Sequence, residues 1–178
     1  MVPERAQSTV SSARKPAAKR HPHRRPWLIL RVILVGQSGE TLPEPPGRDL
    51  LVSTAHTFRQ IAAAIDRAFA RWDVSHVHEF HLADGRRVVA ADDDGFEDGD
   101  LDEAVETLAR LDIPLGRSFE YVFDLGAGWE HACTVLRDQV DPREEAGILP
   151  TEILPVFGWG AIPDQYGRAA PDSDDSSV

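Results

Sequence analysis

The hydrophobic pattern begins with an apolar run that follows the first 26 residues. Residues 27–35 are apolar on both alternating faces apart from Arg31, which is typical of a strand in the middle of a sheet. The next segment, residues 36–49, contains three prolines. Because proline lacks the backbone donor that a strand needs, this segment is predicted to be an irregular connection.

The clearest helix is predicted over residues 57–71. Its apolar residues recur at spacings of three and four, which places them on one helix face. They are Phe58, Ile61, Ala62, Ile65, Ala68 and Phe69. Thr57 precedes them and is a residue type that accepts hydrogen bonds from the amides of a first helical turn. The helix is therefore predicted to bury this stripe against a sheet.

Extended segments and loops follow the helix. Residues 75–83 and 87–90 flank an Asp-Gly turn, which predicts two strands of a hairpin. Residues 92–103 are strongly acidic, contain two glycines and are predicted to be a solvated loop. Residues 101–111 have a loosely helical spacing of apolar positions, with a short strand over residues 105–108 as the alternative.

The strongest hairpin signal lies in residues 118–124 and 129–136, which both alternate between apolar and polar positions. Gly126 and Gly128 lie between them and suit a tight connection. One face of the first strand carries Phe119, Tyr121 and Phe123, and one face of the second carries Trp129, His131, Cys133 and Val135. Whether these faces coincide depends on the turn, because a slip of one residue moves every side chain to the other face.

Residues 155–167 are aromatic and rich in Gly and Pro, without periodicity. They are predicted to form an ordered loop over the sheet, anchored by Trp159 and Tyr166. The alternative is that they edge a binding groove, because rigid aromatic side chains concentrate at interfaces. Together the elements predict an α+β fold: an antiparallel-rich sheet with one principal amphipathic helix and long loops.

Composition divides the chain into a folded unit and two tails. A length of 178 residues suits one domain with tails. Residues 1–26 are rich in Ser, Ala, Pro and basic side chains, and residues 169–178 in Pro, Asp and Ser. Neither segment has an apolar period, so both are predicted to be disordered. The folded domain is predicted over residues 27–168.

Charge is unevenly distributed along the chain, whose net value is −11. Residues 1–25 contain seven Lys or Arg and one Glu, a net charge of about +6, which leaves about −17 on the remainder. An acidic surface repels phosphate backbones. Residues 1–25 are therefore the one segment suited to contact nucleic acid.

The number of cysteines and the hydropathy of the chain indicate where in the cell the protein is expected. Cys133 is the only cysteine, so no intramolecular disulfide can form, and a small buried apolar role is predicted for it. The apolar run at residues 27–30 is interrupted by Arg31 and is too short to span a bilayer. A cytoplasmic location without membrane association is predicted.

The second hairpin carries a specific motif, Tyr121-Val-Phe-Asp-Leu-Gly-Ala-Gly-Trp-Glu-His131. It resembles the aromatic-x-aromatic-Asp-Phe-Gly-Asp-x-Trp-x-His signature of the plasmid pRiA4b ORF-3-like family. The matching positions are Tyr121, Phe123, Asp124, Gly126, Trp129 and His131. Leu125 replaces the family's Phe and Ala127 its second Asp. The resemblance covers residues 27–166 and implies a bacterial protein of plasmids and mobile elements without an assigned activity.

The main functional hypothesis is a non-catalytic accessory or binding module associated with plasmids or mobile elements, with no cofactor. It would present Tyr121, Asp124, Trp129, His131 and Trp159 to an unknown protein or small-molecule partner. In the competing structural interpretation, Asp124 caps the amides of the turn, while Trp129 and His131 fill the sheet face.

The first alternative is a metal-dependent hydrolase or nuclease. His76 and His78 lie two apart on a predicted strand, so both project from one face, whereas His81 points to the other. With Asp124 and His131 they would bind a divalent metal. A weaker alternative is a DNA-associated protein that acts through the basic arm of residues 1–25.

Overall fold

The computed structural model describes residues 27–91 and 96–168. The two tails predicted to be disordered lie outside the described residues, and so does part of the predicted acidic loop. The elements are β1 (Trp27–Gln37), β2 (Glu40–Thr41), β3 (Gly47–Ser53), α1 (Phe58–Ala68), β4 (His78–His81), β5 (Arg87–Val89), β6 (Leu101–Asp102), β7 (Ser118–Phe123), β8 (Trp129–Val140), α2 (Pro142–Ala146) and β9 (Leu154–Trp159).

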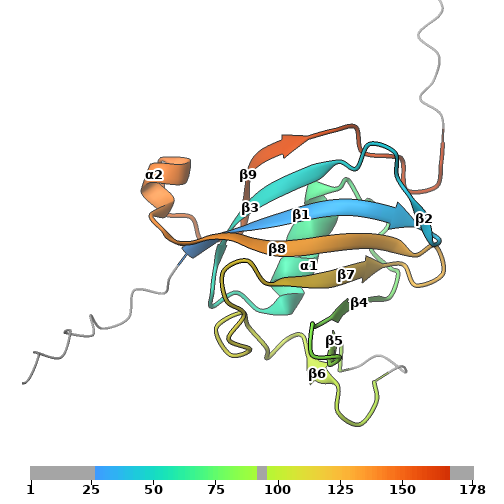
Figure 1. Ribbon diagram of the computed structural model, residues 1–178, viewed down its shortest axis with the longest axis horizontal. Helices are drawn as coiled ribbons and strands as arrows, with labels where there is room; N and C mark the ends of the chain where they lie inside the picture. Colours follow the sequence, from blue (N-terminus) through green and yellow to red (C-terminus); the bar gives the residue numbers. More distant parts are fainter. Residues whose placement is uncertain (1–26, 92–95, 169–178) are drawn as a thin grey trace, which may run out of the picture.

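One twisted sheet organises the molecule, with α1 across one of its faces (Figure 1). The strand order is β6-β5-β4-β7-β8-β1-β3-β9, and β2 pairs with β1. The pair β5–β6 is parallel, whereas the other described pairs are antiparallel. The predicted α+β class with an antiparallel-rich sheet and one principal helix is therefore confirmed.

Strand β1 lies between β8 and β3, which confirms the prediction of a central strand. Its one charged residue, Arg31, pairs across the sheet with Asp49 of β3 through two hydrogen bonds of 2.8 and 2.9 Å. A bidentate partner of this kind allows an arginine to occupy a central strand.

Residues 36–49 are more regular than predicted, because β2 and the start of β3 lie within them. The last of the three prolines, Pro46, directly precedes β3. Strand β3 escaped prediction because its apolar Leu-Leu-Val run is short and Arg48 and Asp49 precede it. Asp49 can lie in a buried strand because Arg31 donates a hydrogen bond to its carboxylate, and no local sequence pattern reveals this contact.

Helix α1 begins as predicted. The Thr57 hydroxyl accepts a hydrogen bond from Gln60 N at 3.3 Å, and the Gln60 side chain accepts one from Thr57 N at 2.9 Å, which is a complete capping box. The helix ends at Ala68, before the predicted boundary, and Ala70 adopts a left-handed φ of 53°. The chain therefore turns away from the helix just before Arg71.

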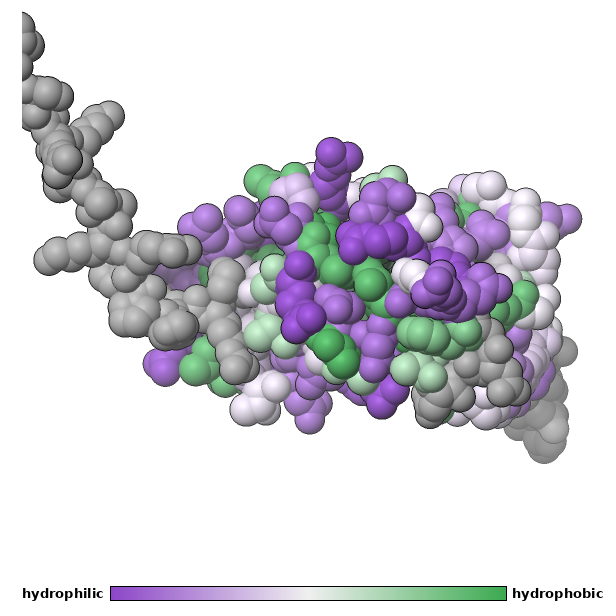
Figure 2. Space-filling view, turned by 90° about the horizontal axis from the view of Figure 1, so that it is seen from below, coloured by the Kyte–Doolittle hydropathy of each residue, from purple (hydrophilic) through white to green (hydrophobic). Residues whose placement is uncertain are grey.

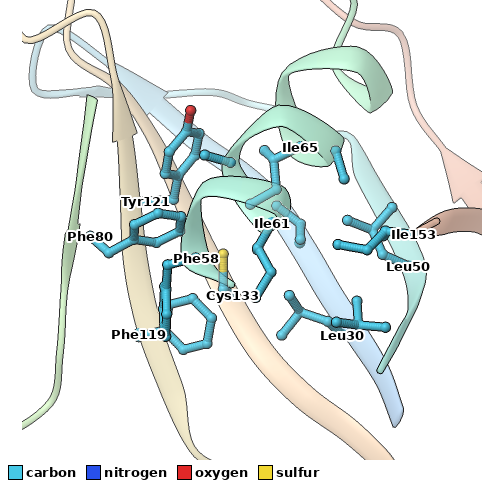
Figure 3. Packing of buried hydrophobic residues seen from close by; sticks show 14 of the residues in the cluster. Leu30, Leu50, Phe58, Ile61, Ile65, Phe80, Phe119, Tyr121, Cys133 and Ile153 are labelled. Carbon is cyan, nitrogen blue, oxygen red and sulfur yellow. The ribbon is translucent and has the colours of Figure 1, made fainter. Parts of the chain in front are cut away.

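The core lies between α1 and the sheet (Figure 3). Aromatic rings gather on one side of the helix, where Phe58 and Phe80 meet edge to face with centroids 4.9 Å apart. Leu30, Leu50 and Ile153 lie on the other side. Cys133 is fully buried among these residues, as the sequence predicts.

Strands β7 and β8 form the predicted hairpin, with Tyr121 opposite His131 and Phe123 opposite Trp129. The aromatic faces of the two strands therefore coincide and both face α1. This register answers the question that the alternation alone left open.

Three other segments differ from prediction. Residues 155–167 were expected to be a loop, but β9 pairs with β3 and forms an edge of the sheet. Helix α2 was not predicted. In residues 101–111 neither a helix nor a strand over 105–108 forms, and the two-residue β6 lies at the start. Neither helix in the described part of the chain has the length and apolar content to cross a bilayer.

Candidate functional site

The motif residues lie at one end of the sheet, where three segments meet. These are the β7–β8 turn (residues 124–128), the loop from 71 to 77 and the segment 160–168 that follows β9. We call this region the hairpin end, and we call residues 160–168 the strap. A hydrogen bond of 3.0 Å from Asp124 N to Val77 O joins the turn to the loop.

The turn is organised by Asp124, which has a left-handed φ of 55°. Its Oδ1 accepts hydrogen bonds from Gly126 N and Ala127 N, both at 3.1 Å. This is the capping role of the structural interpretation. The second carboxylate oxygen, Oδ2, lies 3.3 Å from His76 Nδ1, so Asp124 also faces the loop.

The strap is held on the loop by Gln165, which is buried. Its side-chain oxygen accepts hydrogen bonds from Trp72 N at 3.1 Å and Asp73 N at 3.2 Å. Its side-chain nitrogen donates to Asp73 O at 2.9 Å. Three hydrogen bonds from one side chain thus fix the strap beside the residues that follow Arg71.

Four polar side chains contact one another at the surface of the hairpin end. They are Asp73, His76, Asp124 and Tyr166, and we call them the rim. The Tyr166 hydroxyl donates to Asp73 Oδ2 at 2.7 Å and lies 2.9 Å from His76 Nε2. Because the hydroxyl proton goes to the carboxylate, His76 Nε2 is the donor in the second contact. Hydrogen bonds from Ser75 and Tyr166 lower the pKa of Asp73 to about 2.

The rim does not form a metal site. Asp124 lies at Nδ1 of His76 and Asp73 at its Nε2, 3.6 Å away. These two nitrogens point in opposite directions, so the two carboxylates cannot share one ion with the imidazole. Within residues 27–91 and 96–168 no group of three or more His, Cys, Asp or Glu is placed to hold a metal.

His78 belongs to a separate cluster. Its Nε2 lies 2.8 Å from Glu103, which is also 3.0 Å from Arg59 Nε. Burial opposes the charge of both partners, but their mutual contact outweighs it, so the pKa of His78 is raised and that of Glu103 is lowered. The structure thus brings together His76 and Asp124, and leaves His78 and His131 elsewhere.

Beneath the rim lies a buried polar layer between α1 and the hairpin. The Tyr121 hydroxyl donates to Asp66 Oδ1 at 2.8 Å. Burial raises the pKa of Asp66 to about 6, although the Tyr121 hydrogen bond and the charges of His78 and Arg71 act in the opposite direction. Burial also raises the pKa of Tyr121, and the adjacent Asp66 carboxylate adds to the increase.

His131 occupies the same layer in a fixed orientation. Its Nδ1 lies 3.2 Å from Tyr121 O and 3.1 Å from Trp129 O. Carbonyl oxygens only accept hydrogen bonds, so Nδ1 carries the proton. Burial, helped by the charge of Arg71, lowers the pKa of His131 to about 3. The imidazole is therefore neutral, with a lone pair on Nε2.

Arg71 completes the layer. Its guanidinium carbon lies 4.0 Å from the centre of the Trp129 ring, and the side chain is buried. Burial lowers the pKa of Arg71 to about 10, with Asp66 opposing the decrease. The guanidinium is therefore charged at neutral pH.

These positions correct part of the binding-surface hypothesis. Tyr121, Trp129 and His131 are 0–1% exposed, because their face of the hairpin is the one that α1 covers. Trp159 lies on β9, where its Nε1 donates to Pro45 O at 3.2 Å. Of the five residues, only Asp124 belongs to the surface of the hairpin end.

Sequence reasoning missed Asp66, Arg71 and Glu103. A signal existed for Asp66, because it lies four residues after Ala62 and so belongs to the apolar side of the helix. Glu103 lies in an acidic stretch where nothing distinguishes it from its neighbours. Arg71 follows the helix without any local motif.

Other hollows lie away from this end. Two of about 410 and 480 Å³ share residues 112–114 in their linings. Figure 2 views the molecule from the side of β5 and β6, where hydrophobic areas are separated by hydrophilic ones. None of the motif residues lines either hollow.

The fold and the hairpin motif together define the class of protein. A sequence model described as plasmid pRiA4b ORF-3-like protein matches residues 41–154, more than half of the chain. The chain therefore belongs to the plasmid pRiA4b ORF-3-like family, as its hairpin motif predicts. No match to the chain is found among the curated proteins.

A solved structure has a similar fold. It is the crystal structure of MM3350, a protein of unknown function from Methanosarcina mazei Go1, with a TM-score of 0.60 and 19% sequence identity. The match covers 75% of this chain and 69% of that chain. At this identity the likeness shows the fold alone, and neither comparison assigns an activity.

Proposed function

We propose that the protein is a non-catalytic accessory or binding module that recognises a protein partner through the hairpin end. The observation that carries the proposal is a group of exposed apolar side chains on a rigid base. Trp72, Val74 and Tyr166 are 54%, 63% and 48% exposed. Trp72 and Tyr166 pack edge to face with ring centroids 5.1 Å apart. Fixed aromatic side chains of this kind contribute most of the energy of many interfaces.

The chemistry of the hairpin supports binding over catalysis. The pKa of His131 lies at about 3, so the imidazole cannot exchange protons near neutral pH as a general acid or base does. Burial raises the pKa of the Cys133 thiol, which keeps it protonated and unreactive. The buried motif residues thus have a structural role beneath the exposed Trp72, Val74 and Tyr166.

The partner's charge follows from the charge of the protein. The chain beyond residue 25 carries a net charge of about −17, which favours partners with basic side chains and disfavours nucleic acid. We therefore propose a protein segment that combines basic and apolar residues. The association with plasmids or mobile elements is part of the proposal and rests on the family's name.

Peptide display against the full chain tests the proposal. We expect selected peptides to be basic and apolar, and to lose binding to Trp72→Ser. The matched control is Phe157→Ser, because Phe157 is an equally exposed aromatic residue on β9, at 60%. Failure of the full chain to select any peptide, or equal binding to Trp72→Ser, would contradict the proposal.

The metal-dependent hydrolase is the second candidate; His76 and Asp124, two of its four expected ligands, lie 3.3 Å apart, but the described residues place no third ligand beside them. Metal analysis of untagged protein decides the point. Stoichiometric zinc, manganese or iron that is lost in His76→Ala would support the hydrolase.

DNA binding through residues 1–25, which lie outside the described residues, would instead be salt-sensitive and lost on their removal.

A further inference from the structure

The buried layer contains side-chain nitrogens without hydrogen-bond partners. Arg71, Trp129 and His131 are 4%, 1% and 1% exposed. All three nitrogens of the Arg71 guanidinium, Trp129 Nε1 and His131 Nε2 lack a partner. Buried polar groups in folded proteins are nearly always hydrogen-bonded, so several exceptions in one layer require an explanation.

The contacts that Arg71 does make leave its donors unused. The guanidinium carbon of Arg71 lies 4.0 Å from the centre of the Trp129 ring, and none of the three guanidinium nitrogens has a hydrogen-bond partner. The N–H bonds of a guanidinium lie in its plane and point outward. The Asp66 carboxylate accepts from Tyr121 and acts on Arg71 only through the field of its charge. The planar donor array of the arginine therefore remains unpaired.

The donor or acceptor character of these unpaired nitrogens indicates which ligand could form hydrogen bonds with them. The guanidinium and the indole N–H only donate hydrogen bonds, and both suit an oxyanion. His131 Nε2 differs, because Nδ1 already donates to Tyr121 O and Trp129 O, which makes Nε2 an acceptor in the neutral ring. A complementary ligand carries negative oxygens together with one hydroxyl.

From these contacts we infer that Arg71, Trp129 and His131 form a binding site for a hydroxyl-bearing oxyanion, of which hydrogen phosphate is the simplest example. Arg71 holds two oxygens through its planar donors, Trp129 Nε1 donates to the anion, and His131 Nε2 accepts from the hydroxyl. The ligand's charge also neutralises the buried guanidinium.

The strap controls access to this site. The atoms are enclosed, and Gln165 fixes the strap to the two residues directly after Arg71. Asp164 of the strap is close enough to raise the pKa of Arg71. If the ligand enters where the strap detaches, Gln165→Ala should speed its association. This site lies below the surface assigned to the protein partner and does not depend on it.

Calorimetric and thermal-shift titration of the full chain with inorganic phosphate and with sulfate tests the inference. Phosphate is expected to bind saturably and to raise the melting temperature, and sulfate, which has no hydroxyl at neutral pH, to bind more weakly. Trp129→Phe keeps an aromatic ring but removes the N–H donor, and we expect roughly tenfold weaker phosphate binding, the value of one charge-assisted hydrogen bond. Arg71→Met should abolish binding.

The control is Arg110→Gln, which removes an exposed arginine that pairs with Glu106. Its phosphate affinity should equal that of the unaltered protein. Absence of saturable phosphate binding to the full chain, or unchanged binding in Trp129→Phe, overturns the inference. Equal binding of sulfate and phosphate overturns the role of His131. Trp129→Phe keeps an aromatic ring beside the guanidinium, so these results hold even if Arg71→Met fails to fold.

Discussion

Replacing Arg71 by Met tests the energetic reasoning about the buried layer. A buried charge without hydrogen-bond partners destabilises a fold, and an apolar residue of similar length removes this cost. Met matches the Arg stem as far as Nε, lacks the guanidinium carbon and its terminal nitrogens, and can make a favourable sulfur contact with an aromatic ring. We therefore expect Arg71→Met to be more stable than the unaltered protein, contrary to the usual effect of a core substitution.

The magnitude follows from the contacts. Each buried donor left unsatisfied costs about 1–3 kcal/mol, and the guanidinium has three such nitrogens. Arg71→Met also loses the cation–π contact with Trp129, which stabilises the fold by about 2 kcal/mol when desolvated. A sulfur–aromatic contact that stabilises by about 1 kcal/mol replaces it. With the lowest cost of about 1 kcal/mol for each of the three nitrogens, the balance favours Met by about 2 kcal/mol, within the range measured for replaced buried ion groups.

Urea unfolding and thermal denaturation in phosphate-free buffer measure this difference, and we expect the melting temperature to rise by about 4–8 °C. Arg48→Met is the matched control. Arg48 also lies over an aromatic ring, that of Phe69, but its Nη1 donates to Gly47 O at 2.6 Å and Trp159 O at 2.7 Å. That variant should lose about 1–2 kcal/mol. If Arg71→Met loses stability as Arg48→Met does, Arg71 has partners in solution and the reasoning is wrong.

Three further predictions concern other buried contacts. Tyr121→Phe removes the hydroxyl that donates to Asp66, and should cost about 1–3 kcal/mol in urea unfolding while raising the pKa of Asp66 above 6 in an NMR titration. Asp66 also makes stability pH-dependent: its pKa is raised from 3.8 to about 6 on folding, so its contribution is fully present below pH 3.8 and is lost as the pH rises through 6. As the pH rises from 3.8 to 6, the free energy of unfolding of the unaltered protein should therefore fall by about 3 kcal/mol relative to that of Asp66→Asn. If the two proteins show parallel curves of stability against pH, this prediction is wrong. In Gly47→Ala the new Cβ would overlap the Trp159 ring, and the forced repacking should cost about 1–3 kcal/mol, whereas an unchanged urea midpoint would show that the ring moves freely.

The fold was predictable wherever one element contains its own signal. The capping box of Thr57, the stripe of α1 and the alternation of β7 and β8 are all local patterns, and each has its predicted structure. Strand β3 was missed because Asp49 is charged and its partner Arg31 lies on another strand. Strand β9 was missed because prolines and glycines obscure its alternation, which pairing with β3 nevertheless fixes.

For the candidate site, the hairpin motif pointed to the end of the molecule where the proposed site lies, but it did not predict which of its residues are buried. Alternation placed Tyr121 and His131 each on one face of its own strand, and only the register of the pair shows that these faces coincide. Alternation also could not show that this face is the covered one. That depends on where α1 packs. The strap, held by Gln165, depends equally on a contact between residues far apart in the chain.

The sequence alone determined the elements that follow short-range rules: the central strand, the capped amphipathic helix, the Gly-rich hairpin, and the family to which the motif belongs. Only the tertiary structure decided that Asp66 meets Tyr121, that Arg71 stacks on Trp129, and that three nitrogens of a charged side chain lie inside without partners. The physical reason is that periodicity fixes the direction of a side chain relative to its own element. Burial and hydrogen bonding depend instead on which other element covers it.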